Sequence, residues 1–211
     1  MCAVCSGVLI RRLGRVEYVP TIDAMRSFTA RRGAGTPDEF WLLEHPPVYT
    51  LGQAADPAHG PGGAGHIPVV RADRGGEITY HGPGQAVLYT LVDLARRGIK
   101  VREFVRMLER SVIDTLAAHG ARAQCRPGAP GVYVAGAKVG ALGLRIVRGR
   151  CYHGVALNVD CDLAPFAAID PCGYPGLAVT STRELGVVAG AAALGEELAS
   201  NLIGLLEHVH A

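Results

Sequence analysis

The sequence predicts an α/β fold of the α+β kind, in which a mixed β-sheet packs against helices. Three observations predict it. Segments typical of strands and of helices are both present, and they do not alternate as regular βαβ units. Hydrophobic residues make up 49% of the 211 residues, which is enough to bury a large core. No internal repeat or low-complexity segment divides the chain, so we expect residues 1–211 to fold as a single domain.

Eight short segments rich in β-branched, aromatic and aliphatic residues predict the strands. In chain order they are residues 8–12, 40–43, 67–70, 78–80, 86–91, 132–134, 138–147 and 152–159. The pair Ala135-Gly136 and the triplet Arg148-Gly149-Arg150 separate the last three segments, and such residues are typical of tight turns. We therefore expect these three strands to form a meander.

Three segments predict helices. Residues 101–119 carry the clearest pattern, with apolar residues on one stripe and Gly120 as the stop signal. Residues 22–32 follow Thr21, which we expect to cap that helix. Residues 194–210 form an amphipathic helix at the end of the chain.

Two long segments predict loops. Residues 52–66 are rich in Gly, Pro, Ala and Asp, and they precede the most glycine-rich part of the chain. A flexible loop at such a place is a candidate lid over a substrate. Residues 160–182 are also rich in loop-forming residues. His45-Pro46-Pro47 ends the second strand, and the simplest interpretation of His45 is a polar residue at a strand end.

Composition excludes several classes of function. The formal net charge of +2 is too weak to predict a nucleic-acid partner. No apolar run is long enough to span a bilayer, and no export signal is visible, so we expect no membrane and a cytoplasmic location. The six cysteines are then expected to be thiols. Cys2 and Cys5 form a CxxC pair without a matching second pair, so no metal site is predicted.

The rest of the chain is organised around residues 74–89, with the sequence RGGEITYHGPGQAVLY. Glycines at both ends of its first strand allow a backbone to approach a ligand closely. We expect two short strands joined by a rigid turn, with His81 and Gln85 at its edge. The alternative is a hairpin whose histidine has no chemical role.

Lys138 is one of only two lysines among 21 basic residues. It lies in AGAKVGALG, where small apolar neighbours indicate a crowded strand. A buried lysine, unlike an arginine, is able to give up its proton. Lys138 is therefore a candidate for acid–base chemistry, and the alternative is a strand-edge lysine that extends to water.

Cys172 lies in the segment DPCGYPG, residues 170–176, whose prolines and glycines restrict the backbone. Such a loop presents a thiol rigidly instead of burying it in a core. A nucleophilic thiol also needs a partner that accepts its proton, and a neutral lysine is able to do this. His81 and His153 are further candidates for a base or an orienting group, although His153 is equally well interpreted as a hydrogen-bonded strand residue.

Three segments together resemble the lipoyl(octanoyl) transferases, which are related to the biotin and lipoate protein ligases. They are RGGEITYHGPGQAVLY, the pair AKVGALGLR and CYHGVALNV, and FAAIDPCGYPGLAVTS, and the resemblance covers residues 40–186 in order. It implies the biotin/lipoate-protein-ligase-like fold for one octanoyltransferase catalytic domain. It also implies that Cys172 carries the acyl group and that Lys138 tunes its thiol.

The same resemblance implies the residues that bind the acyl group. They are Arg74, Gly75, Gly76, Glu77, Ile78, Thr79, Tyr80, His81, Ala141, Leu142, Gly143, Gly154, Val155 and Ala156. His153, Gln85 and Asn158 are candidates for supporting roles. The abundance of glycine and alanine agrees with this assignment, because small residues leave room for a straight alkyl chain.

The implied reaction moves an octanoyl or lipoyl group from acyl carrier protein to a lysine of a lipoyl domain, through a Cys172 thioester. The implied acceptors are the E2 subunits of 2-oxoacid dehydrogenases and the H protein of glycine cleavage, and no cofactor, metal or nucleotide is expected. The implied carrier is acidic, and candidates for docking it are the basic residues Arg145, Arg148, Arg150, Arg96, Arg97 and Lys100; the alternative is a solvated basic rim. The alternatives are an ATP-dependent lipoate or biotin ligase, a cysteine hydrolase, and a non-catalytic acyl-binding module.

Overall fold

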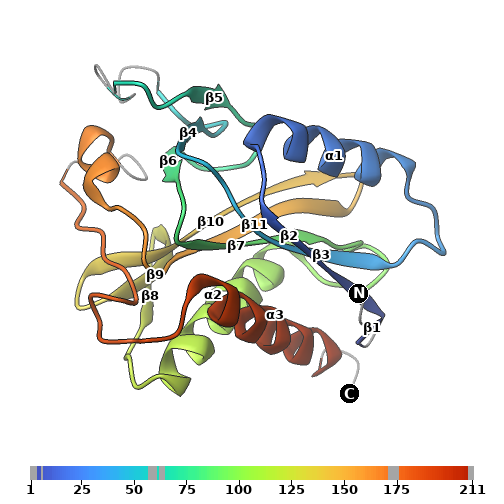
Figure 1. Ribbon diagram of the computed structural model, residues 1–211. Helices are drawn as coiled ribbons and strands as arrows, with labels where there is room; N and C mark the ends of the chain where they lie inside the picture. The colour runs from blue at the N-terminus through green and yellow to red at the C-terminus, as the bar shows by residue number, and fades with distance from the viewer. Residues whose placement is uncertain (1–3, 6, 57–60, 62–64, 171–175, 209–211) are drawn as a thin grey trace.

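The structure is a computed structural model that describes residues 4–5, 7–56, 61, 65–170 and 176–208. It contains an eight-stranded sheet and a three-stranded sheet (Figure 1). In spatial order the large sheet consists of β1 (Val4–Cys5), β2 (Val8–Arg15), β3 (Asp38–Glu44), β7 (Gln85–Leu91), β11 (Arg150–Asn158), β10 (Ala137–Val147), β9 (Ala129–Val134) and β8 (Gln124–Arg126). The small sheet consists of β5 (Val69–Arg71), β4 (Val48–Leu51) and β6 (Ile78–His81).

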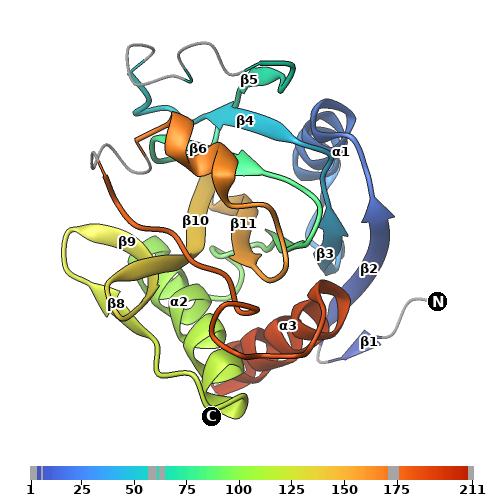
Figure 2. The same cartoon turned by 60° about the vertical axis from the view of Figure 1, so that its left-hand side comes forward.

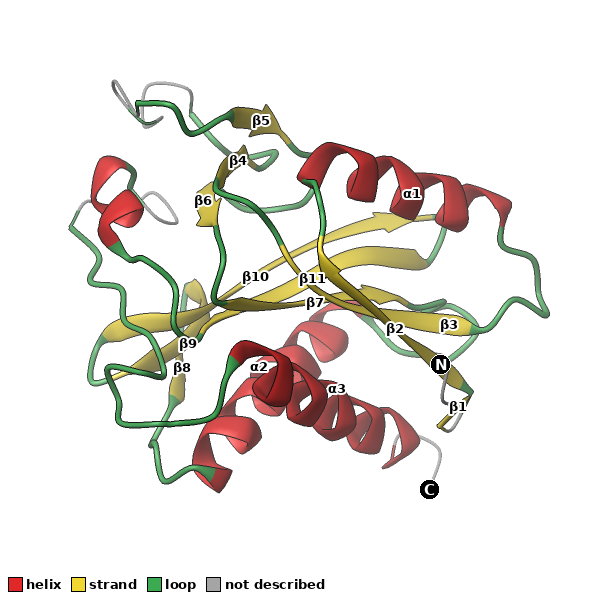
Figure 3. Ribbon diagram, viewed as in Figure 1, coloured by secondary structure: helices red, strands yellow, loops and turns green. Residues whose placement is uncertain are grey.

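Helices cover both faces of the large sheet (Figure 3). Helices α2 (Val101–Ala118) and α3 (Ala191–Glu207) pack on one face, and α1 (Tyr18–Arg31) packs on the other. The small sheet lies on the same side as α1 (Figure 2), next to a short 3-10 helix, η2 (Ala164–Ala168). Both parallel and antiparallel strand pairs occur, so the predicted α+β class with a mixed sheet is confirmed.

Strand β7 shows why the centre of the sheet is hydrophobic on both faces. All seven of its residues are buried. Ala86 and Leu88 contribute to the core under α2 and α3, whereas Val87, Tyr89 and Leu91 face α1. Successive strand residues point to opposite faces, so a strand that is covered on both sides needs an apolar run instead of an alternating pattern.

The meander of β9, β10 and β11 and the long helix α2 are confirmed. The first turn places Ala135 and Gly136 at φ +48° and +89°, and the second places Arg148 and Gly149 at +50° and +78°. Two consecutive residues with positive φ define the hairpin turn whose twist matches that of the flanking strands. Local turn chemistry was therefore sufficient to predict these pairings.

The predicted ends of two helices are wrong. Helix α1 begins at Tyr18, so Thr21 lies inside its first turn and does not cap it. The Thr21 hydroxyl instead donates to the Glu17 carbonyl four residues earlier (2.6 Å), as helical serines and threonines often do. Helix α3 begins at Ala191, three residues before the predicted start, and its N-cap is Gly190.

Strands β6 and β7 do not form a hairpin, so the hairpin alternative is wrong. Strand β6 pairs with β4 in the small sheet, and β7 pairs with β3 and β11 in the large one. The turn between them must pass very close to other atoms. A Cβ on Gly82 would lie 2.2 Å from the Tyr80 hydroxyl, and one on Gly84 (φ +84°) would lie 2.5 Å from the Asp160 carbonyl oxygen. The glycines therefore allow the chain to cross between the two sheets.

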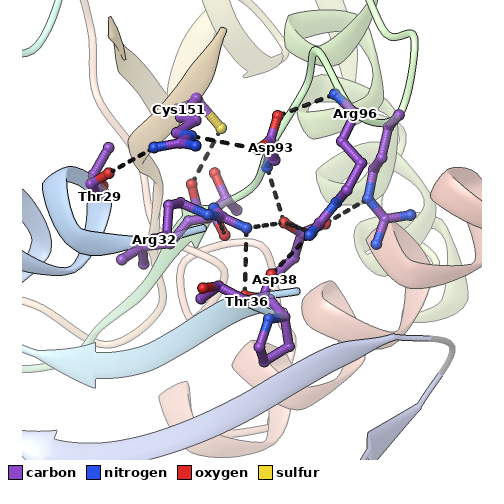
Figure 4. Close-up of polar contacts among 12 residues, drawn as sticks. Thr29, Arg32, Thr36, Asp38, Asp93, Arg96 and Cys151 are labelled. Atoms are coloured by element: carbon purple, nitrogen blue, oxygen red, sulfur yellow. Dashed lines mark hydrogen bonds and ion pairs between the residues drawn. The ribbon is translucent and has the colours of Figure 1, made fainter. Parts of the chain in front are cut away.

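The buried carboxylate of Asp38 connects the C-terminal end of α1 to the start of β3 and to the segment after β7 (Figure 4). The side chain of Asp38 is fully buried and forms ion pairs with Arg32, Arg96 and Arg97. It also accepts a hydrogen bond from the Asp93 backbone N–H (2.9 Å). Burial alone would raise the pKa of Asp38, but these donors outweigh it and lower the pKa.

We expect Asp38→Ala to lower the free energy of unfolding by about 3–5 kcal/mol, because it leaves the buried Arg32 guanidinium without its carboxylate. Urea unfolding at pH 7 measures the change. The control is Asp160→Ala, which breaks an ion pair with Arg183 in which both side chains are more than half exposed. That variant should lose less than about 1 kcal/mol. Equal losses in both variants would contradict a special role for the buried site.

Candidate active site

A cavity lies between the two sheets. Its floor is formed by β7, β10 and β11 of the large sheet, and its roof by β6 and the segment before it. It leaves about 60 Å³ for the centres of water-sized molecules, and its exposed lining is mostly apolar. One water needs about 10–15 Å³ by this measure, so the cavity accommodates a ligand larger than a single solvent molecule.

The structure brings most of the predicted site residues to this cavity. On its walls are Arg74, Gly76, Glu77, Ile78, Thr79, Tyr80, His81, Gln85, Lys138, Ala141, Leu142, Gly143, His153, Gly154, Val155, Ala156 and Asn158. Gly75 does not line it, but its N–H donates to the Leu144 carbonyl (2.8 Å) and so fixes the roof to β10. Cys172 lies outside the described residues. Phe166 and Val179, on either side of its segment, both line the cavity.

Arg74 holds the roof in place. Its guanidinium is buried and donates to the Thr50 carbonyl (2.7 Å) and the Thr50 hydroxyl (2.8 Å) of β4. Gly52 makes a second close contact, because a Cβ there would lie 2.1 Å from the Gly76 carbonyl oxygen. Gly52 was not among the predicted site residues. The roof segment is therefore tied to β4 by charge-assisted hydrogen bonds and by close backbone packing.

The glycines of the floor have different roles. A Cβ on Gly154 would lie 2.1 Å from the Leu88 carbonyl oxygen, so this glycine is required by the pairing of β11 with β7. A Cβ on Gly143 would lie 3.0 Å from the Gly75 carbonyl oxygen, so this one sets how closely roof and floor approach. Ala156 already has a side chain on the cavity wall. It is therefore the position at which a larger residue would fill the cavity without breaking the sheet.

Lys138 lies at the cavity and is only 4% exposed, which contradicts the alternative of a lysine that extends to water. Its N–H donates to the Ala178 carbonyl (2.8 Å), and its carbonyl accepts from the Thr180 N–H (3.0 Å). The stretch around Val179 thus lies beside β10 like a short added strand. This stretch follows the Cys172 segment directly in the chain.

A directional chain of hydrogen bonds fixes His81. The Gln85 amide nitrogen donates to the Tyr80 carbonyl (3.1 Å) and to Asn158 Oδ1 (3.0 Å), so Gln85 Oε1 must accept from His81 Nδ1–H (3.1 Å). Asn158 in turn donates to the Thr180 carbonyl (3.1 Å). Burial lowers the pKa of His81 well below its usual value. His81 is therefore neutral at pH 7, with the proton on Nδ1 and a lone pair on Nε2.

His153 belongs to a second network, centred on Asp73. His153 lies on β11 with a backbone φ of +63°, and its ring donates from Nε2 to Asp73 Oδ1 (2.8 Å). Tyr152 and Arg26 also donate to this carboxylate. Burial opposes ionisation of Asp73, but the three donors outweigh it and hold its pKa far below the usual value. Burial also lowers the pKa of His153, despite the adjacent carboxylate, so His153 is neutral at pH 7.

Several residues of this region were missed or misinterpreted by the sequence analysis. His45 is fully buried and does not simply end a strand; it donates from Nδ1 to the Val16 carbonyl (2.7 Å) and accepts from the Tyr89 hydroxyl (2.8 Å). Tyr18 stacks on His81, with ring centroids 5.7 Å apart. Tyr89 ends the glycine-rich segment 74–89 but was not among the predicted site residues, whereas Tyr18 and Asp73 lie outside the three segments that carry the family resemblance. Within the described ranges, no group of three or more metal-binding side chains occurs.

We expect the stability of the protein to fall below pH 6.5, because burial lowers the pKa of His45 to about 4. A histidine with a lowered folded pKa contributes stability above its unfolded pKa of about 6.5, and this contribution is lost as pH falls towards the folded value. From His45 alone, the free energy of unfolding should be about 2 kcal/mol lower at pH 5 than at pH 7.5. Urea titrations of the wild type and of His45→Gln measure this. The variant should show a correspondingly smaller change, and identical changes in both proteins would contradict the assignment.

Comparison with known proteins identifies the family. Residues 18–200 match the family described as lipoyl protein ligase A/B catalytic domain. The chain is 59% identical to an octanoyltransferase of Aromatoleum aromaticum, over 96% of this chain and 87% of the relative. It is 63% identical to an octanoyltransferase of Thiobacillus denitrificans, over 85% of this chain and 82% of the relative.

Solved structures show the same fold at low sequence identity. A bipartite lipoate protein ligase of Thermoplasma acidophilum superposes with a TM-score of 0.74 at 15% identity, over 94% of this chain and 83% of that one. A biotin protein ligase of Aquifex aeolicus gives 0.56 at 11% identity, over 94% and 69%. The expected ligase-like fold is thereby confirmed. None of the helices in the described part of the chain is long and apolar enough to cross a membrane. The chain belongs to the lipoyl protein ligase A/B catalytic-domain family and, within it, to the octanoyltransferases, which are acyltransferases.

Proposed function

We propose that the protein carries an octanoyl group as a thioester on Cys172 and passes it to a lysine of a lipoyl domain, with acyl carrier protein as the donor. The observation that carries this proposal is the position of Lys138, a buried lysine at a mostly apolar cavity. Its backbone hydrogen-bonds to residues 178 and 180, a few positions after Cys172 in the chain. Acyl transfer through a thiol needs such a base, at a site that also takes up the acyl chain.

In the first half-reaction, Lys138 takes the thiol proton and the Cys172 thiolate attacks the octanoyl thioester. The bond to the carrier's thiol breaks, and that thiol leaves with the proton. In the second half-reaction, the acceptor amine attacks the acyl-enzyme and gives its proton to Lys138. An amide bond forms, the Cys172–acyl bond breaks, and the released thiolate takes the proton from Lys138, which restores the thiol and the base.

The cavity suits an alkyl chain for a physical reason. An octanoyl tail has about six methylenes, each of which gains about 0.8 kcal/mol when it leaves water. Complete burial is therefore worth about 5 kcal/mol of binding. Ile78, Ala141 and Ala156 provide apolar lining, and Gly143 and Gly154 keep the floor flat.

The partners follow from the reaction and from the relatives. One of the similar ligase structures is described together with its E2 lipoyl domain. We therefore assign lipoyl domains of the E2 subunits and the H protein as acceptors.

The surface arginines expected to dock the carrier differ in whether they already form ion pairs within the protein. Arg96, Arg97 and Arg150 form ion pairs with Asp38 or Asp93, whereas Arg148 is exposed beside the β10–β11 turn. Arg148 is thus the better candidate for contact with an acidic carrier.

Cys172→Ser should leave no stable acyl adduct and little transfer, because a serine hydroxyl is much harder to deprotonate than a thiol of pKa about 8.5. Lys138→Arg keeps the positive charge but removes the base, so a proton-shuttling role predicts loss of transfer. Intact mass and single-turnover transfer from octanoyl carrier measure both variants. An adduct on another cysteine, such as Cys151, would overturn the assignment. Turnover of free octanoate with ATP would favour the ligase alternative.

Ala156→Val should shift the preferred acyl chain towards hexanoyl, because the added methyl groups occupy the cavity wall. Octanoyl transfer should fall about tenfold relative to hexanoyl transfer, the range that one or two methylenes provide. The control is Ala86→Val, which adds the same bulk to the neighbouring strand on the opposite face of the sheet. An unchanged ratio of octanoyl to hexanoyl transfer in Ala156→Val would remove Ala156 from the acyl site.

A further inference from the structure

The backbone of β9 and β10 determines where the Lys138 side chain lies. Lys138 lies opposite Tyr133 in the antiparallel pairing of these strands, and side chains of directly opposed residues share one face. The register shifts by one residue between Lys138 and Gly140, which marks a β-bulge. Bulges bend a strand and re-aim the side chains beside them.

Gly131 leaves the space that the lysine stem uses. A Cβ on this residue would lie 2.4 Å from Lys138 Cε and 3.1 Å from Nζ. Its φ of +136° also disfavours any residue with a side chain. The Gly131 N–H donates to Glu109 Oε1 on α2 (3.3 Å), which anchors this part of β9 to the helix. The stem therefore crosses a gap that the backbone holds open.

Tyr133 provides a surface for the end of the stem. Its ring is fully buried, and the Lys138 ammonium lies 5.6 Å from the ring centroid. The face of an aromatic ring carries negative electrostatic potential and attracts a cation within about 6 Å, most strongly where water is excluded. Lys138 is 4% exposed, so the ring face replaces part of the hydration that the ammonium has lost.

We propose that Tyr133 is a positioning residue for the acyl-transfer reaction, because its ring face and the gap at Gly131 hold the Lys138 amino group in one place and favour the ammonium that forms when this group takes the thiol proton. The proposal rests on the function proposed above. A lysine stem has four flexible carbons, so a fixed position for its amino group needs contacts that restrict its rotamers. Tyr133 acts through Lys138, by restricting where this lysine accepts and returns a proton.

Variants of the ring separate its electrostatics from its shape. Tyr133→Phe keeps the ring face and should retain acyl-enzyme formation within about threefold. Replacing Tyr133 by trifluorophenylalanine keeps the shape but removes most of the negative potential, and should slow formation about tenfold relative to Tyr133→Phe. Tyr133→Leu should slow it at least as much. The rate is measured in single-turnover reactions at saturating octanoyl carrier, and the KM for the carrier should stay the same.

A second readout reports on the thiol itself. The rate of Cys172 alkylation by iodoacetamide, followed by peptide mass spectrometry across pH, should show its midpoint moved to higher pH in the fluorinated and Leu variants but not in Tyr133→Phe. Arg126→Gln is the matched control, because Arg126 is the other cation against this ring, at 5.2 Å, and it is exposed. It should leave both readouts unchanged.

The outcomes distinguish this inference from the proposed function. If Lys138→Ala abolishes acyl-enzyme formation while the fluorinated ring reacts like Tyr133→Phe, the positioning role is wrong and the proposed function stands. If Lys138→Ala reacts normally, the proposed function itself fails. Thermal unfolding of every variant identifies loss of fold, and the fluorinated variant keeps the test valid if Tyr133→Leu does not fold.

Discussion

The cavity depends on one crossing of the chain between two sheets. Strand β6 belongs to the small sheet and β7 to the large one, and only three residues connect them. The Glu44 carboxylate accepts from the Gly84 N–H (2.8 Å), and the N–H groups of Val159 and Asp160 donate to the Gly84 carbonyl. These bonds hold the crossing against both β3 and the end of β11. If β6 paired with β7, the roof would lie in the plane of the floor and no cavity would form.

Three histidines around the cavity are neutral at pH 7. His45, His81 and His153 all have lowered pKa values, chiefly because burial disfavours the charged form. Each makes hydrogen bonds that neutral rings are able to make, and the amides of Gln85 and Asn158 have fixed orientations. Satisfied buried networks of this kind rigidify their surroundings. The three neutral rings therefore add rigidity around the cavity without adding charge to it.

Local signals account for the parts of the fold that could be predicted. The turns at Ala135-Gly136 and Arg148-Gly149 determined the meander, and a periodic apolar stripe determined α2. The partners of β6 could not be read from its sequence, because pairing with β4 depends on contacts 30 residues away along the chain. The same holds for Asp38, whose arginine partners Arg96 and Arg97 are 58 and 59 residues distant.

Site residues divide in the same way. The glycine-rich segment, Lys138 and the residues around Gly154 belong to distinctive local sequence, and the fold gathers them at one cavity. Tyr18 and Asp73 reach this region from a helix and a loop outside any motif, and Tyr89 was not recognised although it ends the glycine-rich segment. Their contacts arise only from tertiary packing, as in the stacking of Tyr18 on His81.

The bulge beside Lys138 adds one residue to β10, and this extra residue decides on which face of the sheet the Lys138 side chain lies. Successive side chains of a strand point to opposite faces of the sheet. Removing the extra residue at Val139 would therefore restore regular pairing with β9, but the side chains on one side of the deletion would then point to the opposite face. A more regular sheet would therefore turn either Lys138 or the cavity residues from Ala141 onwards to the wrong side. Single-residue deletions should be tolerated in the loops of this protein far better than at this point. The irregularity in β10 thus places Lys138 and the cavity residues from Ala141 onwards on one face of an otherwise ordinary antiparallel meander.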